Sequence, residues 1–454
     1  MTTEDSLPPT DLGSQQQPVP EHPSEQETPA NNTPSQPGKG PLRALTSLRH
    51  RNYRLYLSGQ MISLIGTWMQ AIGQSWLILQ LTHSGWQLGL VGALQALPIL
   101  FFSLFGGIFA DRWPKRLIVL VTQGAALLQA LLLWILTVTG TIQIWHIYIL
   151  ALLLGFINCL YRPAVQSFAI EMVGPEDLPN AVALNSSLSQ LTRIAGPSLG
   201  GMIIAVSSVS LLFLLNALSF LAVVVSLLLI NSRKLYVQVS HHSPTSEQQK
   251  IWQSLQEGLA YVWHTPVALL MTLVVGLVLL FGSNFGVVLP LLATDVLHVG
   301  AAGYGFLSAA MGIGALLSTL WLAWDNRRPT TRDVLTGSLA FCVLLAVFAA
   351  SRIYPLSLVL IVSVSFAEMA FATQALTSLQ TLVPDHLRGR ATSVQVLFFD
   401  GSLPLGYLLT GWLAGLYGAP ATLLISALLC LLVVGAGWLW RKSAEQDAAA
   451  LTRV

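Results

Sequence analysis

Gly107-Ile-Phe-Ala-Asp111-Arg112-Trp-Pro-Lys115-Arg116 places four charges within six positions between two long apolar runs. No charged residue occurs from Gln87 to Ala110 before it or from Leu117 to Trp145 after it. Over the whole chain only 9% of residues are charged, whereas a soluble protein carries about 25%. So few charges cannot cover a water-facing surface, and the sequence therefore predicts an all-α integral membrane protein with this turn at the membrane surface.

Apolar stretches of about 20 residues, the length that crosses a bilayer as a helix, recur along the chain. We expect twelve of them, near residues 55–81, 87–110, 116–139, 146–170, 180–205, 209–230, 267–294, 302–324, 333–351, 355–381, 389–416 and 420–440. With both termini in the cytoplasm, every predicted inner segment is basic and only Arg352 falls in an outer loop. The chain is thus expected to be a multi-pass protein of the cytoplasmic (inner) membrane.

The connecting segments divide the chain into two halves. Residues 1–41 are rich in Pro, Gln, Ser and Thr and predict a disordered cytoplasmic tail. A six-helix bundle is expected at 42–230 and a second at 266–441, followed by a C-terminal tail at 442–454. Between the bundles, residues 231–265 predict a cytoplasmic linker that ends in an amphipathic helix. The linker is either a plain connection or a regulatory segment.

The two halves also resemble each other in sequence. Val173–Ala181 is similar to Val383–Ala391, and from there Gly196 and Gly201 align with Gly406 and Gly411. Two related bundles predict pseudo-symmetry, a substrate site near the membrane midplane between them, and rocking of the bundles about that site.

Two motifs resemble those of the major facilitator superfamily. The turn at Gly107–Arg116 is similar to the motif between its second and third helices, with Pro114 where that motif usually has Gly. Gly196-Pro197-Ser198-Leu199-Gly200-Gly201 is similar to the fifth-helix motif associated with exporters, although Thr192 replaces a Gly usually found before it. Further stretches resemble the subgroup of enterobactin exporters and macrolide efflux proteins: Gly66–Gln70, Ser75–Thr82, Arg162–Ala164 and Glu257–Tyr261.

The resemblance assigns roles to both motifs. Asp111 would face the start of the eleventh helix, where a carboxylate is stabilised by exposed amides, and Arg112 or Arg116 would pair with Glu171. The expected cytoplasmic latch comprises Gly107, Asp111, Arg112, Lys115, Arg116 and Glu171. The alternative is a charge cluster that only sets orientation. In the fifth-helix motif, Pro197 would bend the helix, and Gly196, Gly200 and Gly201 would allow a neighbouring helix to approach closely. The alternative is helix packing with no special role.

Four charges lie inside predicted spans: Arg162 and Arg193 in the first half, and Glu368 and Asp400 in the second. Charge in a bilayer is costly and usually pairs or lines a wet cavity. We expect Glu368 first and Asp400 second as proton carriers, with the arginines as partners in a charge switch. A purely structural pairing between the bundles is the alternative.

The midplane also carries polar residues that suit a bulky, weakly polar substrate. The candidates for the substrate cavity are Gln70, Gln74, Asn158, Tyr161 and Asn284. Each could instead serve helix packing. The three cysteines lie singly in apolar runs, so no metal and no cofactor are expected.

These features predict a secondary transporter that exports a small amphipathic molecule, such as a drug, macrolide or siderophore-like compound, as a proton antiporter. An ATP-driven pump would need a phosphate-binding loop ending in Gly-Lys-Ser/Thr, which the sequence lacks, and no catalytic cluster suggests an enzyme. A uniporter without proton coupling, or a sensor without flux, stays open. The expected partners are the substrate, the proton and the lipid bilayer, with no nucleic acid, and the chain is expected to be a monomer.

Overall fold

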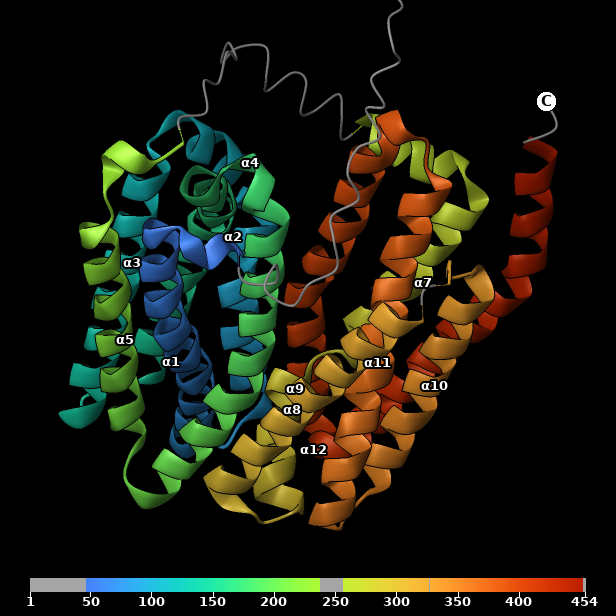
Figure 1. Ribbon diagram of the computed structural model, residues 1–454. Helices are drawn as coiled ribbons and strands as arrows, with labels where there is room; N and C mark the ends of the chain where they lie inside the picture. Colours follow the sequence, from blue (N-terminus) through green and yellow to red (C-terminus); the bar gives the residue numbers. More distant parts are fainter. Residues whose placement is uncertain (1–45, 237–255, 326, 452–454) are drawn as a thin grey trace, which may run out of the picture. The chain divides into compact units, whose positions relative to one another are not determined.

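The computed structural model describes residues 46–236, 256–325 and 327–451, without the side chains of 103–112, Lys234, His386, Glu445 and 447–451. The predicted N-terminal tail at 1–41, the last three residues of the predicted C-terminal tail at 442–454, and most of the linker lie outside these residues. Residues Leu42–Val454 form one unit by their contacts. Within the described ranges, every regular element is a helix (Figure 1). The expected all-α class is therefore confirmed.

The helices follow the predicted spans closely. The first half contains α1 (Arg51–Thr82), α2 (Gly85–Arg112), α3 (Lys115–Val138), α4 (Ile144–Val206), α5 (Val209–Leu229) and the short η2 (Ser232–Lys234). The second half contains α7 (Pro266–Gly282), α8 (Phe285–Leu291), η3 (Leu292–Val296), α9 (Gly300–Trp324), α10 (Thr331–Ala350), α11 (Tyr354–Leu382) and α12 (Asp385–Leu451). Residues 256–264 form a further helix just before α7.

Two of the helices are long enough to cross a membrane twice, and each bends at a glycine. In α4 the backbone leaves helical geometry at Gly174, with φ of 75°, and in α12 it does so at Gly418, with φ of 74°. Only glycine adopts this left-handed region without steric cost. Pro175 and Pro420 follow the bends and fit the first turn of the next helical segment. Each bend therefore reverses the chain between two consecutive spans.

The number of spans agrees with the sequence. Nine helical stretches within the described residues are long and apolar enough to cross a membrane, and two of them, Ile144–Val206 and Leu387–Ala444, contain the bends. The 32-residue α1 is long enough but carries several amides, which lower its hydropathy. Counting each bent helix twice and adding α1 gives twelve crossings, consistent with the predicted fold.

Two elements differ in detail from the predicted ranges. The expected span at 267–294 is broken at Ser283 and Asn284, which separate α7 from α8, and it ends in the π-helical turn η3. The last span was expected to end near residue 440, but α12 continues to Leu451. The break in the seventh span places two polar residues in the middle of the protein, and one of them, Ser283, reaches the site described below.

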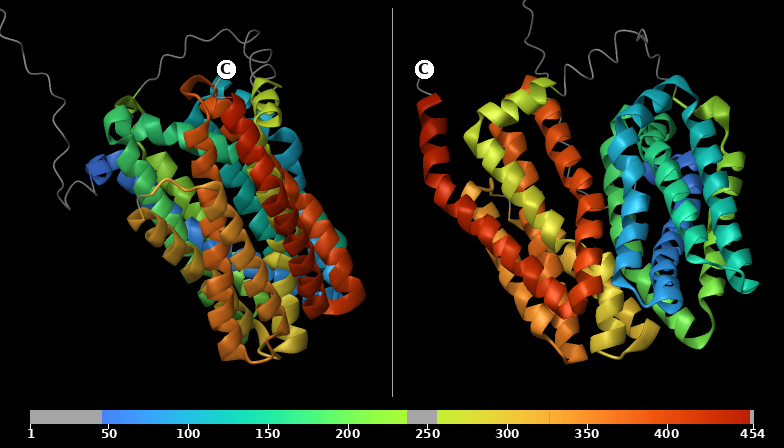
Figure 2. Two further views of the ribbon diagram at one scale, coloured as in Figure 1. Left: turned by 90° about the vertical axis from the view of Figure 1, so that its right-hand side faces the viewer. Right: turned by 180° about the vertical axis from the view of Figure 1, so that it is seen from behind.

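The two bundles meet where α2 packs along α12 and α4 along α9 (Figure 2). Each pair crosses at two glycines. A Cβ built on Gly411 would lie 2.8 Å from the Cα of Gly89, and one built on Gly201 would lie 2.8 Å from the Cα of Gly305. Backbones this close exclude side chains, as in small-residue crossings of membrane helices. Gly201 and Gly411 occupy equivalent positions of the repeat, so the two crossings reflect the pseudo-symmetry that the sequence predicts.

Candidate transport cavity

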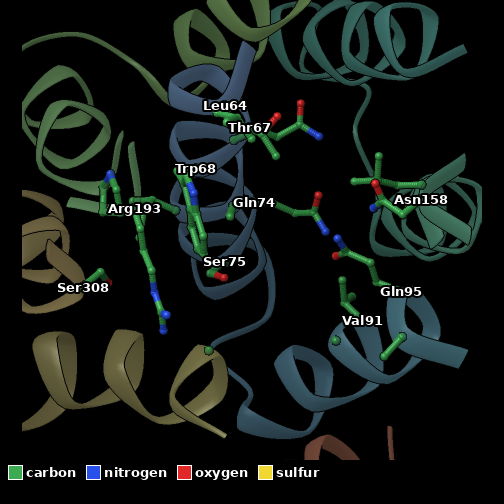
Figure 3. A pocket seen from close by; sticks show the side chains of 18 of the residues that line it. Leu64, Thr67, Trp68, Gln74, Ser75, Val91, Gln95, Asn158, Arg193 and Ser308 are labelled. Carbon is green, nitrogen blue, oxygen red and sulfur yellow. The ribbon is translucent and has the colours of Figure 1, made fainter. Parts of the chain in front are cut away.

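A cavity of about 640 Å³ lies where the two bundles meet (Figure 3). The first bundle lines it with residues of α1, α2, α3, α4 and α5, and the second bundle lines it with Ser283 and residues of α8, α9, α11 and α12. The volume falls within the range of about 300–1,000 Å³ that is usual for small-molecule sites. The cavity is therefore large enough for an organic molecule that touches both bundles.

Four of the five predicted cavity residues line this space: Gln70, Gln74, Asn158 and Tyr161. The fifth, Asn284, does not. It is buried at the break between α7 and α8, where its amide nitrogen donates to the carbonyl of Leu280 at 2.7 Å. Its side chain also packs against Gly406 of α12. The structure thus places Asn284 within the second bundle, next to the cavity wall.

The lining amides differ in whether they are already hydrogen-bonded. Gln70 accepts a hydrogen bond from Asn216 at 2.7 Å and donates one to Gln129 at 3.1 Å, which ties α1 to α5 and α3. Tyr161 donates to Gln60 at 2.9 Å. Gln74 and Asn158 make no hydrogen bond to another described residue, so their polar groups are available to a ligand.

Three of the four predicted charges line the cavity. Arg162 and Arg193 come from α4 and Glu368 from α11, whereas Asp400 of α12 lies outside the lining. The charge of Arg193 acts on Glu368, and that of Arg162 acts on Asp400. The two members of each pair lie in opposite bundles. Neither pair approaches within the 4 Å of an ion pair in this structure.

The local contacts of the two central charges differ. The guanidinium of Arg193 lies over the ring of Trp68, 5.8 Å from its centroid, a cation–π arrangement. The Glu368 carboxylate accepts a hydrogen bond from the Ser283 hydroxyl at the α7–α8 break. The break thus supplies a donor that orients this carboxylate, and α1 supplies an aromatic face that orients the arginine.

Sequence reasoning missed three residues of the site. Gln95 of α2 lines the cavity without a hydrogen bond to a described residue, Ser283 holds Glu368, and Tyr407 packs its ring on Gly92. The repeat carried a signal for part of this. In the alignment that pairs Gly196 with Gly406, Tyr407 pairs with Pro197 and Glu368 with Asn158, and all four residues line the cavity.

The predicted latch is described only in part. The side chains of Asp111 and Arg112, and the surroundings of Gly107, lie outside the described residues. Arg116 does not contact Glu171: its Nη2 donates to the carbonyl of Leu227 at 2.7 Å, and its Nε donates to the same atom at 3.1 Å. Lys115 is the cation whose charge acts on Glu171. Arg116 therefore binds the end of α5 within the first bundle.

The predicted fifth-helix motif lies between the two bundles. Gly196 contacts the side chain of Trp68, and Gly200 faces Met69, both on α1. Gly201 and the carbonyl of Pro197 instead face Gly305 of α9. The motif therefore serves close packing on two sides, against its own bundle and against the other one.

Comparison with known proteins places this architecture in a family. The model of the transmembrane secretion effector family matches residues 42–453. The chain belongs to this family. Its fold is that of major facilitator transporters. The nucleoside transporter NupG superposes with a TM-score of 0.68 at 15% identity, over 85% of this chain and 99% of that one. A bacterial homologue of the iron transporter ferroportin superposes with a TM-score of 0.64 at 16% identity, over 88% of this chain and 99% of that one.

The relatives with assigned functions are 24% to 28% identical in sequence to this chain. The staphyloferrin A transporter of Staphylococcus aureus is 24% identical, over 84% of this chain and 94% of its own length. The multidrug efflux pump Tap of Mycolicibacterium fortuitum is 28% identical, over 86% and 95%. The enterobactin exporter EntS of Shigella boydii is 25% identical, over 75% and 80%. The predicted superfamily and subgroup are thereby confirmed, and the chain is a multi-pass membrane protein.

Proposed function

We propose that this protein exports a small organic molecule of the siderophore or drug type across the inner membrane, in exchange for protons. Membership of a family of secretion effectors, and relatives named as exporters and efflux pumps, support export. The observation that carries the mechanism is the cavity at the bundle junction, with Arg193 and Glu368 facing it from opposite bundles.

Alternating access is supported by where the bundles touch. Both glycine crossings lie toward the ends of the spans opposite the linker, since Gly89 follows the start of α2 and Gly201 precedes the end of α4. At the linker end, the hydrogen bonds and ion pairs between described side chains join residues of the same bundle, such as His50 with Asp177 and Glu257 with Arg390. This arrangement fits a carrier closed on the outer side, with the linker and both termini in the cytoplasm.

The charge pair gives a physical reason for exchange. When Glu368 is ionised and the cavity is empty, Arg193 and Glu368 attract each other across the junction. A proton on Glu368 removes this attraction, and so does a substrate group that neutralises Arg193. Under this scheme the empty, ionised carrier is held in place, whereas the proton-loaded or substrate-loaded carrier can rock. Arg162 and Asp400 form a second pair of the same kind.

The test begins with efflux of dyes, macrolides and siderophores from a host that lacks its own pumps, to identify one transported compound. Proteoliposomes are then loaded with that compound and a pH gradient is imposed. We expect wild-type efflux to follow the gradient, and Glu368→Gln to exchange compound against compound without responding to it. The matched control is Glu176→Gln, since Glu176 is exposed and outside the cavity.

Three results would contradict the proposal. Wild-type efflux that ignores the gradient would make the protein a uniporter, and binding without any flux would make it a sensor. If Glu368→Gln follows the gradient as wild type does, Glu368 is not the proton carrier and its role is a structural pairing between the bundles.

A further inference from the structure

The charges of the cavity wall are unevenly divided between the bundles. Among the lining residues, the first bundle contributes two arginines, Arg162 and Arg193, and no carboxylate. The second bundle contributes one carboxylate, Glu368, which already accepts a hydrogen bond from Ser283. Both guanidiniums lack an ion pair with another described residue. The cavity is therefore richer in hydrogen-bond donors than in acceptors, and it carries an excess of positive charge.

Arg193 is held in a geometry that suits a planar anion. The guanidinium carbon of Arg193 lies over the Trp68 ring, 5.8 Å from its centroid, and Gly196, one turn of α4 further on, contacts the same Trp68 side chain. The packing of Gly196 on Trp68 therefore fixes the ring beside the arginine. A guanidinium presents its N–H groups in a planar fork that matches the two oxygens of a carboxylate. The remaining aromatic surface can receive a flat ligand group.

Three amides on the other side of the cavity are unoccupied. Figure 3 shows Gln74 and Gln95 pointing toward one another, with Asn158 beside them and Arg193 with Trp68 on the opposite side. None of the three amides hydrogen-bonds to another described residue, unlike Gln70. Each offers two N–H donors and one carbonyl acceptor. Because these groups line the cavity and are not tied to the protein, they suit a ligand that carries several polar atoms.

We propose that the cavity binds a planar organic anion, with its oxyanion on the edge of Arg193, its flat part beside Trp68 and its other polar atoms on Gln74, Gln95 and Asn158. This assignment rests on the proposed function, because it names the ligand class of the same cavity. A cationic ligand is disfavoured, since two guanidiniums and only one carboxylate line the cavity. The oxyanion of the ligand would bind the arginine that also attracts Glu368. It would therefore neutralise Arg193, as the exchange scheme requires of the substrate.

The experiment measures equilibrium binding of three probes of one shape and different charge: 1-naphthoate, 1-naphthamide and 1-naphthylmethylammonium. Full-length protein in nanodiscs is titrated without any gradient, and binding to empty nanodiscs is subtracted. We expect wild type to bind naphthoate at least tenfold more tightly than the other two probes. Arg193→Gln should remove that preference, and Arg193→Lys should keep part of it, because lysine retains the charge without the planar fork.

Two further variants separate the parts of the site. Trp68→Leu should weaken the binding of all three probes while naphthoate stays the tightest. The control Arg51→Gln should change nothing, since Arg51 is exposed at the start of α1 and outside the cavity. The proposal is overturned if wild type prefers the amide or the ammonium, or if the preference for naphthoate survives in folded Arg193→Gln.

The binding test and the transport test fail separately. Wild-type charge selectivity needs no variant, so a variant that does not fold leaves the proposal testable. Loss of naphthoate selectivity with intact proton-driven efflux would overturn only the ligand class. Intact selectivity with efflux that ignores the pH gradient would overturn only the proposed exchange.

Discussion

Gly89 of α2 and Gly411 of α12 touch backbone to backbone, so that a single methyl group on Gly411 would lie 2.8 Å from the Cα of Gly89. The two residues belong to opposite bundles, and the crossing of Gly201 with Gly305 repeats the contact on the other side of the cavity. Because the backbones meet without side chains between them, the close approach of the two bundles depends on the absence of four side chains.

The first prediction follows from this contact. Gly411→Ala should push the bundles apart at the crossing, because overpacking costs about 1–3 kcal/mol. That cost would shift the balance away from the outer-closed state by about fivefold to a hundredfold. The measurement is the labelling rate of a cysteine placed at Ser308 in the cavity by a membrane-impermeant reagent added from outside, which we expect to rise.

The control for this prediction is Gly415→Ala, one turn further along α12, where a Cβ would meet only ordinary contacts of 3.7 Å with Trp86. Equal labelling in the two variants would show that the crossing does not hold the outer side closed.

The second prediction separates two amides that sequence reasoning grouped together. Gln70→Met should lower the free energy of unfolding by about 1–3 kcal/mol, because it leaves Asn216 and Gln129 without their buried partner. Gln74→Met should leave stability unchanged, since Gln74 has no hydrogen bond to another described residue, and should weaken binding of naphthoate. Thermal unfolding in detergent and probe titration measure the two effects.

Each variant is the control of the other. If Gln74→Met unfolds as early as Gln70→Met, or if Gln70→Met alone weakens the probe, the division into a structural and a ligand-facing amide is wrong.

The contrast between these amides shows where sequence reasoning stops. The spans and the repeat are encoded in hydropathy, in Lys and Arg placement and in local motifs, so they could be read from the chain. Which face of a helix an amide occupies depends on the partners that packing brings to it. Gln70 accepts a hydrogen bond from Asn216 of α5, and Asn284 packs against Gly406 of α12. Nothing near either residue in the sequence indicates these partners.

Most of the charges inside the membrane could also be placed from the sequence. Arg193 and Glu368 stand out because charge is rare in apolar spans. They lie in the predicted fifth and tenth spans, and both line the cavity. Their immediate neighbours were not predictable: Trp68 and Ser283 reach them only because α1 packs on α4 and because the seventh span breaks at Ser283.

The third prediction concerns Arg116, expected in a latch and found binding the end of α5. Arg116→Ala should lower the free energy of unfolding by about 1–2 kcal/mol, because hydrogen bonds from a charged donor to the carbonyl of Leu227 are lost. Arg54→Ala should have no such effect, since Arg54 is exposed and makes no contact of this kind with described residues. Chemical unfolding in detergent gives both values.

A double-mutant cycle then tests the latch itself. Arg116→Ala and Glu171→Gln should act additively in this conformation, because no hydrogen bond or ion pair joins the two described side chains. A coupling energy well above about 0.5 kcal/mol would show that they pair, as the resemblance implied.

The last prediction is a pH dependence at the linker end of the first bundle. His50 lies 2.8 Å from Asp177, and this hydrogen bond holds the pKa of the Asp177 carboxyl below its usual value of 3.8. A carboxyl whose pKa is lowered by folding stabilises the folded state above its unfolded pKa, and it loses that contribution as the pH falls through the folded pKa. Asp177→Asn should therefore unfold more easily than wild type at pH 6, by about 0.5–1 kcal/mol at most, since the pair is close to solvent. The difference in the free energy of unfolding between wild type and Asp177→Asn should stay constant down to about pH 5 and narrow below pH 4.

Unfolding of both proteins in detergent from pH 6 to pH 3 measures this difference. The matched control is Glu176→Gln, because Glu176 forms no ion pair with a described residue. If Asp177→Asn and Glu176→Gln respond to pH alike, the contact between His50 and Asp177 contributes nothing to stability.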